Sequence, residues 1–563
     1  MAHPPFNGEA DAAIAKVGVE MELSRVSHGL LSSEWRNTTG RSKRIHLSVF
    51  AVMAGLFILA QIFLGLGVNV IRTSDTPVFL GMANAHSVFS AHFLAGPRPP
   101  LVPLVIKLLF GSERLFVAFQ WIVHIVAWGA LAWYYFEHSA YGVRGLALAM
   151  WVFVLALLPQ VHIWNFYIMS ESLSISCLPL VFALLPRCLS YPGVFASLPL
   201  GIVLVGVCML RDIGAYLAVS LGLALLAVDV ATKSRRMSSC LLLGAVIFGL
   251  GYSSITANIG TPTAADKRWV FPFLNVVGQR VLPCPDRLSD FAERGMPVND
   301  ALRARTGKWA SSDGFAFYND PQLASFLVWA TTQGGSTYTS WLLAHPSYLI
   351  KEVLSSRREI LHQTPGELSA YLPGGYPALP ADMSLLDVNL RWVALPFAVA
   401  VPYALWRRRR GPHFGDGNRL RLAFASLVPI PVLMIVTYHG DAMDVARHSV
   451  LVSVYVRLYL LFLAHLLIGG NPVSEAKTPR SKTAAPVGSL PRQQRTGGRG
   501  RPSPVEVEAS GGLGSVSRAG GRRSGRSKSG AWPSLSPTTC FRYWTTVPAG
   551  AVWGRSAGRA PVP

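Results

Sequence analysis

Long apolar segments recur along this chain, and they constrain its fold more than any other feature. From Leu47 onward, runs of about 15–25 mostly apolar residues alternate with polar connections. Such runs approach the length that a helix needs to cross a hydrocarbon core about 30 Å thick. Because backbone amides in lipid must be hydrogen-bonded within their own segment, the runs are predicted to be helices. The sequence therefore predicts an all-α, multi-pass membrane protein.

About ten membrane-spanning helices are predicted from these runs. They cover residues 46–70, 115–136, 145–164, 172–186, 194–210, 213–231, 238–256, 391–406, 419–437 and 447–468. Threading them alternately, with the N-terminus inside, places basic connections on the cytoplasmic side at each turn, as the positive-inside rule requires. These connections hold Arg41, Lys43 and Arg44, Arg144, Arg187, Lys233, Arg235 and Arg236, Arg407–Arg410, and the C-terminal tail. We therefore expect an inner (plasma) membrane protein with both termini in the cytoplasm.

Composition divides the chain into five regions. They are a disordered N-terminus (1–44), a seven-span core (45–256) with an outer loop (71–114), a small mixed extracytoplasmic insert (257–390), three further spans (391–468) and a basic tail (469–563). From residue 471 the tail holds 15 Lys and Arg against 3 Asp and Glu, which accounts for 12 of the 22 net positive charges. Its Gly-, Ser- and Pro-rich composition predicts disorder, with contact to anionic lipid as an alternative to plain solvation. No nucleic-acid partner is expected.

Other classes of site have no support in the sequence. Only Cys284 of the six cysteines falls in the insert, so no disulfide framework is expected there. There is no P-loop, no Cys/His metal spacing and no dinucleotide-binding fingerprint. We therefore predict no metal and no cofactor, and leave a divalent cation open. The first apolar run is too long for a cleaved signal sequence and is predicted to be an uncleaved anchor.

Polar motifs gather in the connections that the threading places outside. Asp75 precedes Thr76-Pro77, which favour a helix start, so helices are predicted over 77–92 and 100–111. Taken alone, Asp75 is more readily a helix cap than a catalytic group. Ser170 and Glu171 either cap the following span or belong to a site.

Two further motifs contain arginines that suit a phosphate ligand. Arg211-Asp212 forms either a local ion pair or a phosphate contact, because guanidinium matches phosphate geometry. The loop from Tyr438 to His448 is strongly polar, and its Asp444 and Arg447 stand one helical turn apart on the same face. Simple anchoring at the membrane interface is the alternative for Arg447 and His448.

The order of these motifs resembles that of the GT-C superfamily of membrane glycosyltransferases, in its bacterial branch. The matching residues are Asp75 with Phe79 nearby, Arg98-Pro99-Pro100, Ser170-Glu171-Ser172-Leu173, and Arg447-His448. The resemblance covers about 45–468 and implies that Asp75 is the base that activates the acceptor. It assigns substrate or phosphate contacts to Arg98, Glu171, Arg211, Asp444, Arg447 and His448. Only one carboxylate matches the acidic motif, which leaves metal use open.

The resemblance is to enzymes of the mannosyl- and arabinosyltransferase kind, and it implies transfer of a sugar, with inversion, from a polyprenyl-phosphate donor. The acceptor would be a hydroxyl of a glycan, lipid or protein on the extracytoplasmic face. The alternatives are a transporter or flippase, and a non-catalytic assembly protein that binds through its insert. A transporter predicts charged residues near the centres of spans and an internal repeat. The spans have almost no charged residues near their centres, and no repeat is evident, which favours the enzyme.

Overall fold

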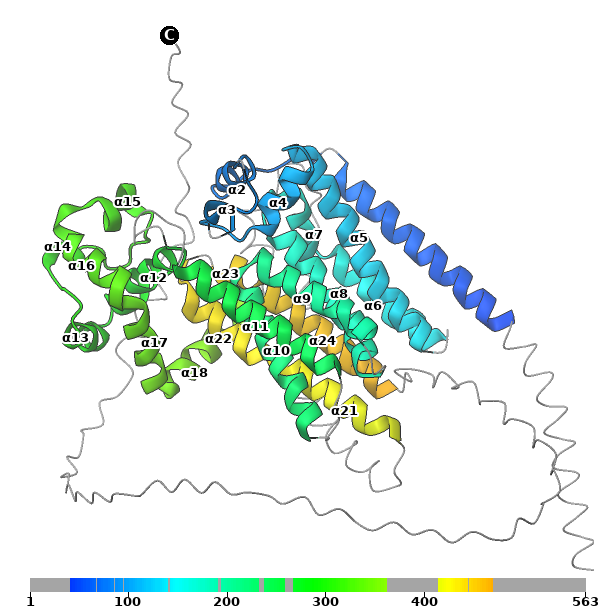
Figure 1. Cartoon of the computed structure of the whole chain (residues 1–563). Coiled ribbons are helices and arrows are strands. Elements are labelled where there is room, and N and C mark those ends of the chain that lie inside the picture. Colours follow the sequence, from blue (N-terminus) through cyan, green and yellow to red (C-terminus); the bar gives the residue numbers. More distant parts are fainter. Residues whose placement is uncertain are drawn as a thin grey trace, which may run out of the picture. The chain divides into compact units, whose positions relative to one another are not determined.

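The described residues of the computed structural model are 41–66, 68–85, 87–94, 96–139, 142–190, 194–231, 237–258, 267–361, 414–443 and 445–468. Within these ranges the regular secondary structure is helical, and the β pairing consists of one isolated bridge between Ile71 and Tyr167. The prediction of an all-α protein is confirmed for the described chain (Figure 1). The predicted N-terminal and C-terminal tails and the 391–406 span lie outside it, apart from residues 41–44, which begin the first helix.

Five helical segments are long and apolar enough to cross a membrane: Arg41–Gly65, Glu113–His138, Glu171–Cys188, Arg421–Gly440 and Val450–Leu467. Helix α6 (Val143–Leu157) and the segment Pro159–Phe166, which holds α7 and η1, meet at a bend of 63° and form a sixth if counted together. Helices α9 (Val194–Leu210), α10 (Asp212–Ala231) and α11 (Met237–Asn258) contain shorter apolar stretches. The described chain thus has several helices that are long and apolar enough to cross a membrane, and the count of ten spans remains a prediction.

Consecutive helices of the core pack against each other. Helix α5 (Glu113–His138) contacts α6 and α8 (Glu171–Ser190), α9 contacts α8, α10 and α11, and α24 (Val450–Ile468) returns to pack on α8. Helix α8 continues through Pro179 and Pro186, so this short predicted span is one helix. Close approach of α9 and α10 requires glycine at 214, where a Cβ would lie 2.2 Å from the carbonyl oxygen of Val207.

The helix directions bring particular helix ends together. The starts of α8, α10 and α24 meet the end of α9 and the end of α22 (Pro429–Gly440) through the side-chain contacts described below. The basic residues Arg144 and Arg187 lie at the other ends of α6 and α8. One end of the bundle therefore gathers mixed charge, and we call it the site end.

The first connection, 68–112, forms two short helices and one very short one. Helix α2 (Thr76–Ala83) ends before the predicted 77–92 helix would, and α3 (Ala91–Leu94) follows a turn. The chain turns here because Lys107 Nζ binds the carbonyl oxygens of Ala83 and Ala85, 3.1 and 2.6 Å away, which a continuing helix would use itself. The second predicted helix is present as α4 (Leu101–Leu108).

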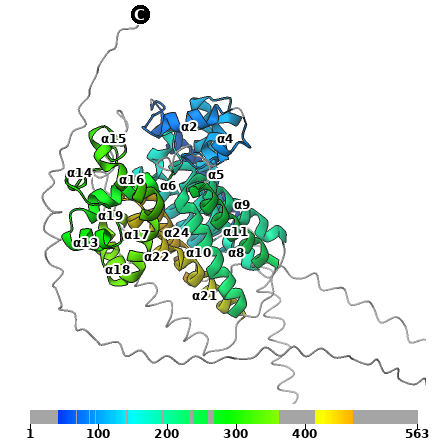
Figure 2. The same ribbon diagram turned by 60° about the vertical axis from the view of Figure 1, so that its left-hand side comes forward.

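The described part of the insert, 267–361, is helical, so the predicted mixed secondary structure is wrong there. Its elements are α12 (Val270–Val276), the π-helix η3 (Val277–Val281), α13 (Pro285–Glu293), α14 (Asp300–Arg303), α15 (Ser312–Asn319), η4 (Pro321–Leu323), α16 (Ala324–Trp329), the π-helix η5 (Ala330–Gly334), α17 (Gly335–Ala344), α18 (Pro346–Ser355) and α19 (Arg357–Leu361). Aromatic side chains fill its core at helical spacing, among them Phe273, Phe291, Trp329 and Trp341, which bury large apolar area. Helices α12 and α18 contact α22, and α19 contacts α24. Figure 2 shows α18 beside α22.

Arg457 is an exception to the near absence of charged residues from the centres of the predicted spans. Arg457 is buried within α24. Its guanidinium binds the hydroxyl of Ser453 on the preceding turn and donates to the carbonyl oxygen of Leu361 at the end of α19, 3.4 Å away. Arg457 therefore donates to backbone carbonyl groups where α19 of the insert packs against α24.

Candidate functional site

Backbone pairing places Asp75 beside Glu171, although the two are far apart in the sequence. The amide of Ile71 donates to the carbonyl of Phe166 (3.0 Å), and the amide of Ile168 donates back to Ile71 (3.3 Å). This single bridge aligns the segment that leads into α2 with the segment that leads into α8. Asp75 and Glu171, which follow it on the two segments, therefore lie at the same end of the bundle.

The carboxylate of Asp75 lies between two guanidinium groups. Arg98 donates to its Oδ1, and Nη1 of Arg447 lies 3.4 Å from its Oδ2. Asp75 stands at the N-cap position of α2, but its side chain makes no capping hydrogen bond. The side chain keeps 16% of its surface exposed and Arg98 keeps 42%. Asp75 therefore pairs with the two arginines and does not cap the helix. Solvent reaches this pair, mostly at Arg98.

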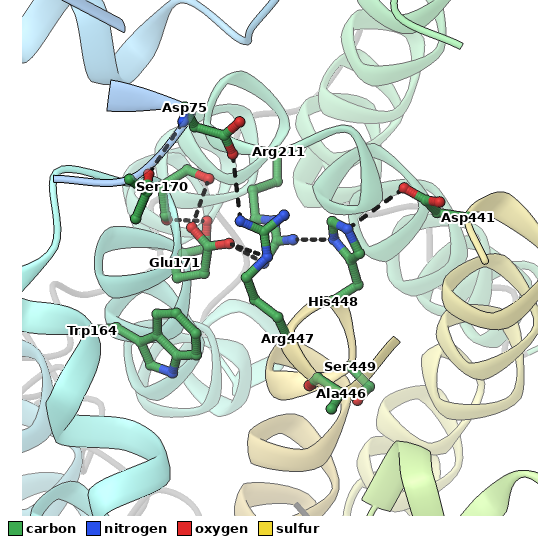
Figure 3. Close-up of polar contacts among 12 residues, drawn as sticks. Asp75, Trp164, Ser170, Glu171, Arg211, Asp441, Ala446, Arg447, His448 and Ser449 are labelled. Atoms are coloured by element: carbon green, nitrogen blue, oxygen red, sulfur yellow. Dashed lines mark hydrogen bonds and ion pairs between the residues drawn. The ribbon is translucent and has the colours of Figure 1, made fainter. Parts of the chain in front are cut away.

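Glu171 is the second carboxylate of the cluster and is almost wholly buried, with 4% of its side chain exposed. Its Oε1 lies 3.6 Å from Nη1 of Arg211 and 4.0 Å from Nε of Arg447. As the first residue of α8 it also lies at the positive end of the helix dipole. Arg447 thus stands between the two carboxylates, Asp75 on one side and Glu171 on the other (Figure 3).

Arg211 extends the cluster to His448. Its Nη2 lies 2.9 Å from Nδ1 of His448. Burial lowers the pKa of Arg211, although Glu171 acts against this, and burial together with Arg447, Arg211 and Arg98 holds the pKa of His448 well below its usual value. His448 is therefore neutral. Because a guanidinium only donates, Nδ1 must be the acceptor, and the imidazole proton is on Nε2.

Asp441 faces that protonated nitrogen, with its Oδ2 3.6 Å from Nε2 of His448. Its Oδ1 accepts from Nδ2 of Asn275 (3.0 Å) and from the amide of Met443 (2.9 Å). Burial raises the pKa of Asp441 to about 6, while Met443, Asn275, Arg280 and Arg447 act in the other direction. Asp441 thus changes its charge close to neutral pH.

Arg268 of the insert fixes the loop that carries Arg98. Its Nε donates to the carbonyl of Gly96 (2.6 Å) and its Nη2 to the carbonyl of Arg98 (3.1 Å). Its Nη1 pairs with Asp212 at 3.2 Å. Asp212 therefore pairs with the insert, while Arg211 turns to Glu171. The local Arg211–Asp212 ion pair considered from the sequence is replaced by these two longer-range pairs.

The structure brings six of the seven predicted site residues together: Asp75, Arg98, Glu171, Arg211, Arg447 and His448. Asp444 lies outside the described residues. Sequence reasoning missed Asp441, Asn275 and Arg268 as members of the site. The polar loop around Asp441 was a usable signal, whereas the insert residues are joined to the cluster by packing that no short motif encodes.

The centre of the cluster holds mixed charge, and Asp441 adds a third carboxylate at its edge. Three guanidiniums, from Arg98, Arg211 and Arg447, share the two carboxylates of Asp75 and Glu171, and the neighbouring His448 is neutral. Within the described ranges, no three His, Cys, Asp or Glu side chains are grouped so that they could hold a metal ion. Partly buried guanidiniums are suited to binding an anion, above all a phosphate.

An apolar groove of about 710 Å³ runs between α10 and the pair formed by α21 (Phe414–Leu427) and α22. It is lined by Tyr216, Val219, Ser220, Leu223, Ala224, Ala227, Val228, Phe424, Val428 and Val432. Tyr216 lies one helical turn from Asp212, near the site end, and Val228 lies three turns further along α10. The groove therefore follows the bundle away from the arginine cluster.

Comparison of the chain with protein-family models, with curated proteins and with solved structures finds no match.

Proposed function

We propose that this protein is a membrane glycosyltransferase that moves a sugar from a polyprenyl-phosphate donor to an acceptor hydroxyl. The observation that carries the proposal is the cluster of three arginines that share two carboxylates at one end of an apolar helix bundle. The acceptor is a glycan, lipid or protein on the extracytoplasmic face, and the donor chain lies among membrane lipids. The motif order that resembles GT-C glycosyltransferases agrees with this assignment.

The arginines supply what the leaving group needs. In a sugar–phosphate–prenyl diester the phosphate carries one negative charge, and cleavage of the sugar–oxygen bond leaves a monoester with a second. Arg98, Arg211 and Arg447 are held in a partly buried, low-dielectric setting, where they stabilise this added charge more strongly than in water. Stabilisation of charge that develops in the transition state is usually the largest catalytic contribution.

The apolar groove supplies a place for the prenyl chain. Its walls on α10, α21 and α22 are almost entirely aliphatic and aromatic, and it begins near Asp212 at the site end. Burying a methylene group contributes about 0.8 kcal/mol, so several prenyl units in this groove would anchor the donor. The phosphate would then lie at the arginine cluster.

Asp75 is the proposed base. In the structure its two oxygens are engaged by Arg98 and Arg447, so it must be released before it can accept a proton. Phosphate binding provides the release, because phosphate oxygens compete for the same guanidiniums. Asp75 then takes the proton of the acceptor hydroxyl, the acceptor oxygen bonds to the anomeric carbon, and the phosphate leaves with the bonding pair. One displacement inverts the anomeric carbon.

The test is transfer from labelled polyprenyl-phosphate sugars by membranes that contain the wild-type protein or Asp75→Asn. Loss of the base is expected to lower the rate by about 10²–10⁴-fold at unchanged protein level. Asp286→Asn, an exposed carboxylate on α13, is the matched control and should keep the wild-type rate. Full retention of transfer by Asp75→Asn would remove the base assignment. Absence of transfer from any such donor by the wild-type protein would contradict the proposed function.

A further inference from the structure

The side chain of Asp441 does not reach the arginines directly, yet it is linked to them through His448. The sequence of contacts runs from Asp441 to Nε2 of His448, from Nδ1 of His448 to Arg211, and from Arg211 to Glu171. Figure 3 shows this line from one edge of the cluster to the other. Arg211 and His448 are 2.9 Å apart, whereas Oδ2 of Asp441 faces Nε2 of His448 at 3.6 Å.

Asp441 is itself fixed by the insert. Asn275 is fully buried; its Oδ1 accepts from the amide of Ala310 (2.8 Å), and its Nδ2 donates to Asp441 (3.0 Å). With the amide of Met443 on the same oxygen, Oδ1 of Asp441 is used by two donors. Oδ2 is therefore the oxygen that faces His448.

We infer that Asp441 is a positioning residue: through His448 it orients Arg211 for a phosphate ligand, and Asn275 links this orientation to the insert. The inference rests on the proposed function, since the ligand is the phosphate of the donor. A carboxylate at Asp441 favours the imidazole proton on Nε2, which leaves Nδ1 free to accept from Arg211. Arg211 is then held with a second nitrogen toward Glu171 and the centre of the cluster.

The Asp441→Asn substitution replaces a hydrogen-bond acceptor beside His448 with a donor, while the side chain keeps nearly the same shape. Asn275 and Met443 both donate to the site of Oδ1, so the new amide oxygen must occupy it. The new amide nitrogen then faces Nε2 of His448, and two donors oppose each other. Moving the imidazole proton to Nδ1 relieves that conflict but sets a donor against the guanidinium of Arg211. Either result misdirects Arg211.

The same geometry predicts a pH dependence. The charged or titratable groups that face Asp441 or His448 are Arg280 of η3, Arg447 of α23 (Val445–His448), Arg211 and Arg98. The arginines stay charged, and His448 stays neutral because its pKa is well below its usual value. Asp441 carries its charge above about pH 6 and loses it below. Phosphate affinity should therefore fall as the pH drops through about 6.

The experiment measures binding of a short prenyl sugar phosphodiester to purified protein in nanodiscs between pH 5 and 8. A diester probe keeps one charge over this range, so the ligand does not titrate. Wild-type protein should bind more weakly below about pH 6. Asp441→Asn should weaken binding about tenfold at pH 7.5 and remove the pH inflection. Asp441→Glu should restore the inflection, and Asp290→Asn, an insert carboxylate that binds Trp341, is the control.

The possible outcomes distinguish failure of the proposed function from failure of the positioning role of Asp441. No binding of the diester by wild-type protein at any pH would contradict the proposed function and this inference with it. Normal binding by wild type, with Asp441→Asn showing the same affinity and the same inflection, would overturn the positioning role alone. A lower melting temperature for Asp441→Asn with unchanged affinity per folded molecule would assign Asp441 to stability and also overturn the inference.

Discussion

Arg447 and Arg457 lie close together in the sequence and both are largely buried, yet their surroundings differ. Arg457 donates to a serine hydroxyl and to backbone carbonyls, which are neutral groups fixed in the folded chain. Arg447 lies between the carboxylates of Asp75 and Glu171, at 3.4 and 4.0 Å. A guanidinium that donates to backbone carbonyls joins two helices by hydrogen bonds. A guanidinium paired with carboxylates at longer distances can bind another anion, such as a phosphate, in their place. The contrast agrees with the proposal that Arg457 is structural and that Arg447 binds the donor phosphate.

The largest effect on stability is expected at Glu171. Glu171→Gln removes the counter-charge of Arg211, whose side chain is 11% exposed, and leaves that guanidinium buried without a carboxylate. Breaking one side of a buried ion pair costs about 3–5 kcal/mol. Thermal unfolding in detergent should show a clearly lowered melting temperature. A melting temperature equal to that of the wild type would mean that the cluster does not depend on its inner carboxylate.

Substitution of the two arginines should separate binding from folding. Arg447→Gln should weaken polyprenyl-phosphate binding about 10–100-fold, while Arg98 and Arg211 still pair with Asp75 and Glu171 and keep the protein folded. Arg457→Gln should do the reverse and lower stability by about 1–3 kcal/mol, because the carbonyl of Leu361 loses its donor. Binding per folded molecule and melting temperature, measured on the same samples, give the comparison. Equal loss of both quantities in Arg447→Gln would favour simple anchoring.

If a donor phosphate replaces Asp75 at Arg98 and Arg447, removing the charge of Asp75 should change phosphate affinity. Asp75→Asn removes the anion that competes for Arg98 and Arg447, so binding of a polyprenyl phosphate should become about 3–10-fold tighter while transfer is lost. Equilibrium binding, with the Asp286→Asn protein as control, measures this. Weaker binding by the variant would show that Asp75 supports the phosphate site instead of competing with the ligand.

The smallest effect is expected at the edge of the cluster. Asp212 pairs with Arg268, but 57% of its side chain is exposed. Exposed pairs contribute about 0–1 kcal/mol, so Asp212→Asn should leave the melting temperature close to that of the wild type. Arg268→Gln should have a larger effect on phosphate binding than Asp212→Asn, because Arg268 also holds the carbonyls of Gly96 and Arg98. Similar binding by the two variants would argue against a role for Arg268 in placing Arg98.

Much of the fold could be predicted from the sequence, because apolar runs of membrane length leave a helix as the stable structure. Helices occupy most of the predicted segments where the chain is described, with exceptions at residues 68–70, at the bend near Leu158 and after Ala83. The turn that separates α2 from α3 could not be predicted, since it depends on Lys107, which reaches back to two carbonyls from another helix. The helical insert was missed for a similar reason, because its aromatic residues suit either kind of core.

Six residues of the candidate site were predicted from the sequence, but their pairings were not. Asp75, Glu171, Arg211 and Arg447 belong to motifs that stand out as polar residues beside apolar runs. The contact between Asp75 and Arg447 joins residues 372 positions apart and is set by how α2, α8 and α24 pack. Asp441 acts through His448 and Asn275, and only the folded chain brings those three together.

The proposed function requires that the arginine cluster bind the phosphate of a prenyl carrier. The most direct measurement compares the affinity of the purified protein in nanodiscs for a long-chain polyprenyl phosphate with its affinity for the matching polyprenol. Wild-type protein should bind the phosphate at least about tenfold more tightly than the alcohol, and Arg447→Gln should lose most of this preference. Equal affinity of the wild-type protein for the phosphate and the alcohol would contradict the proposed function.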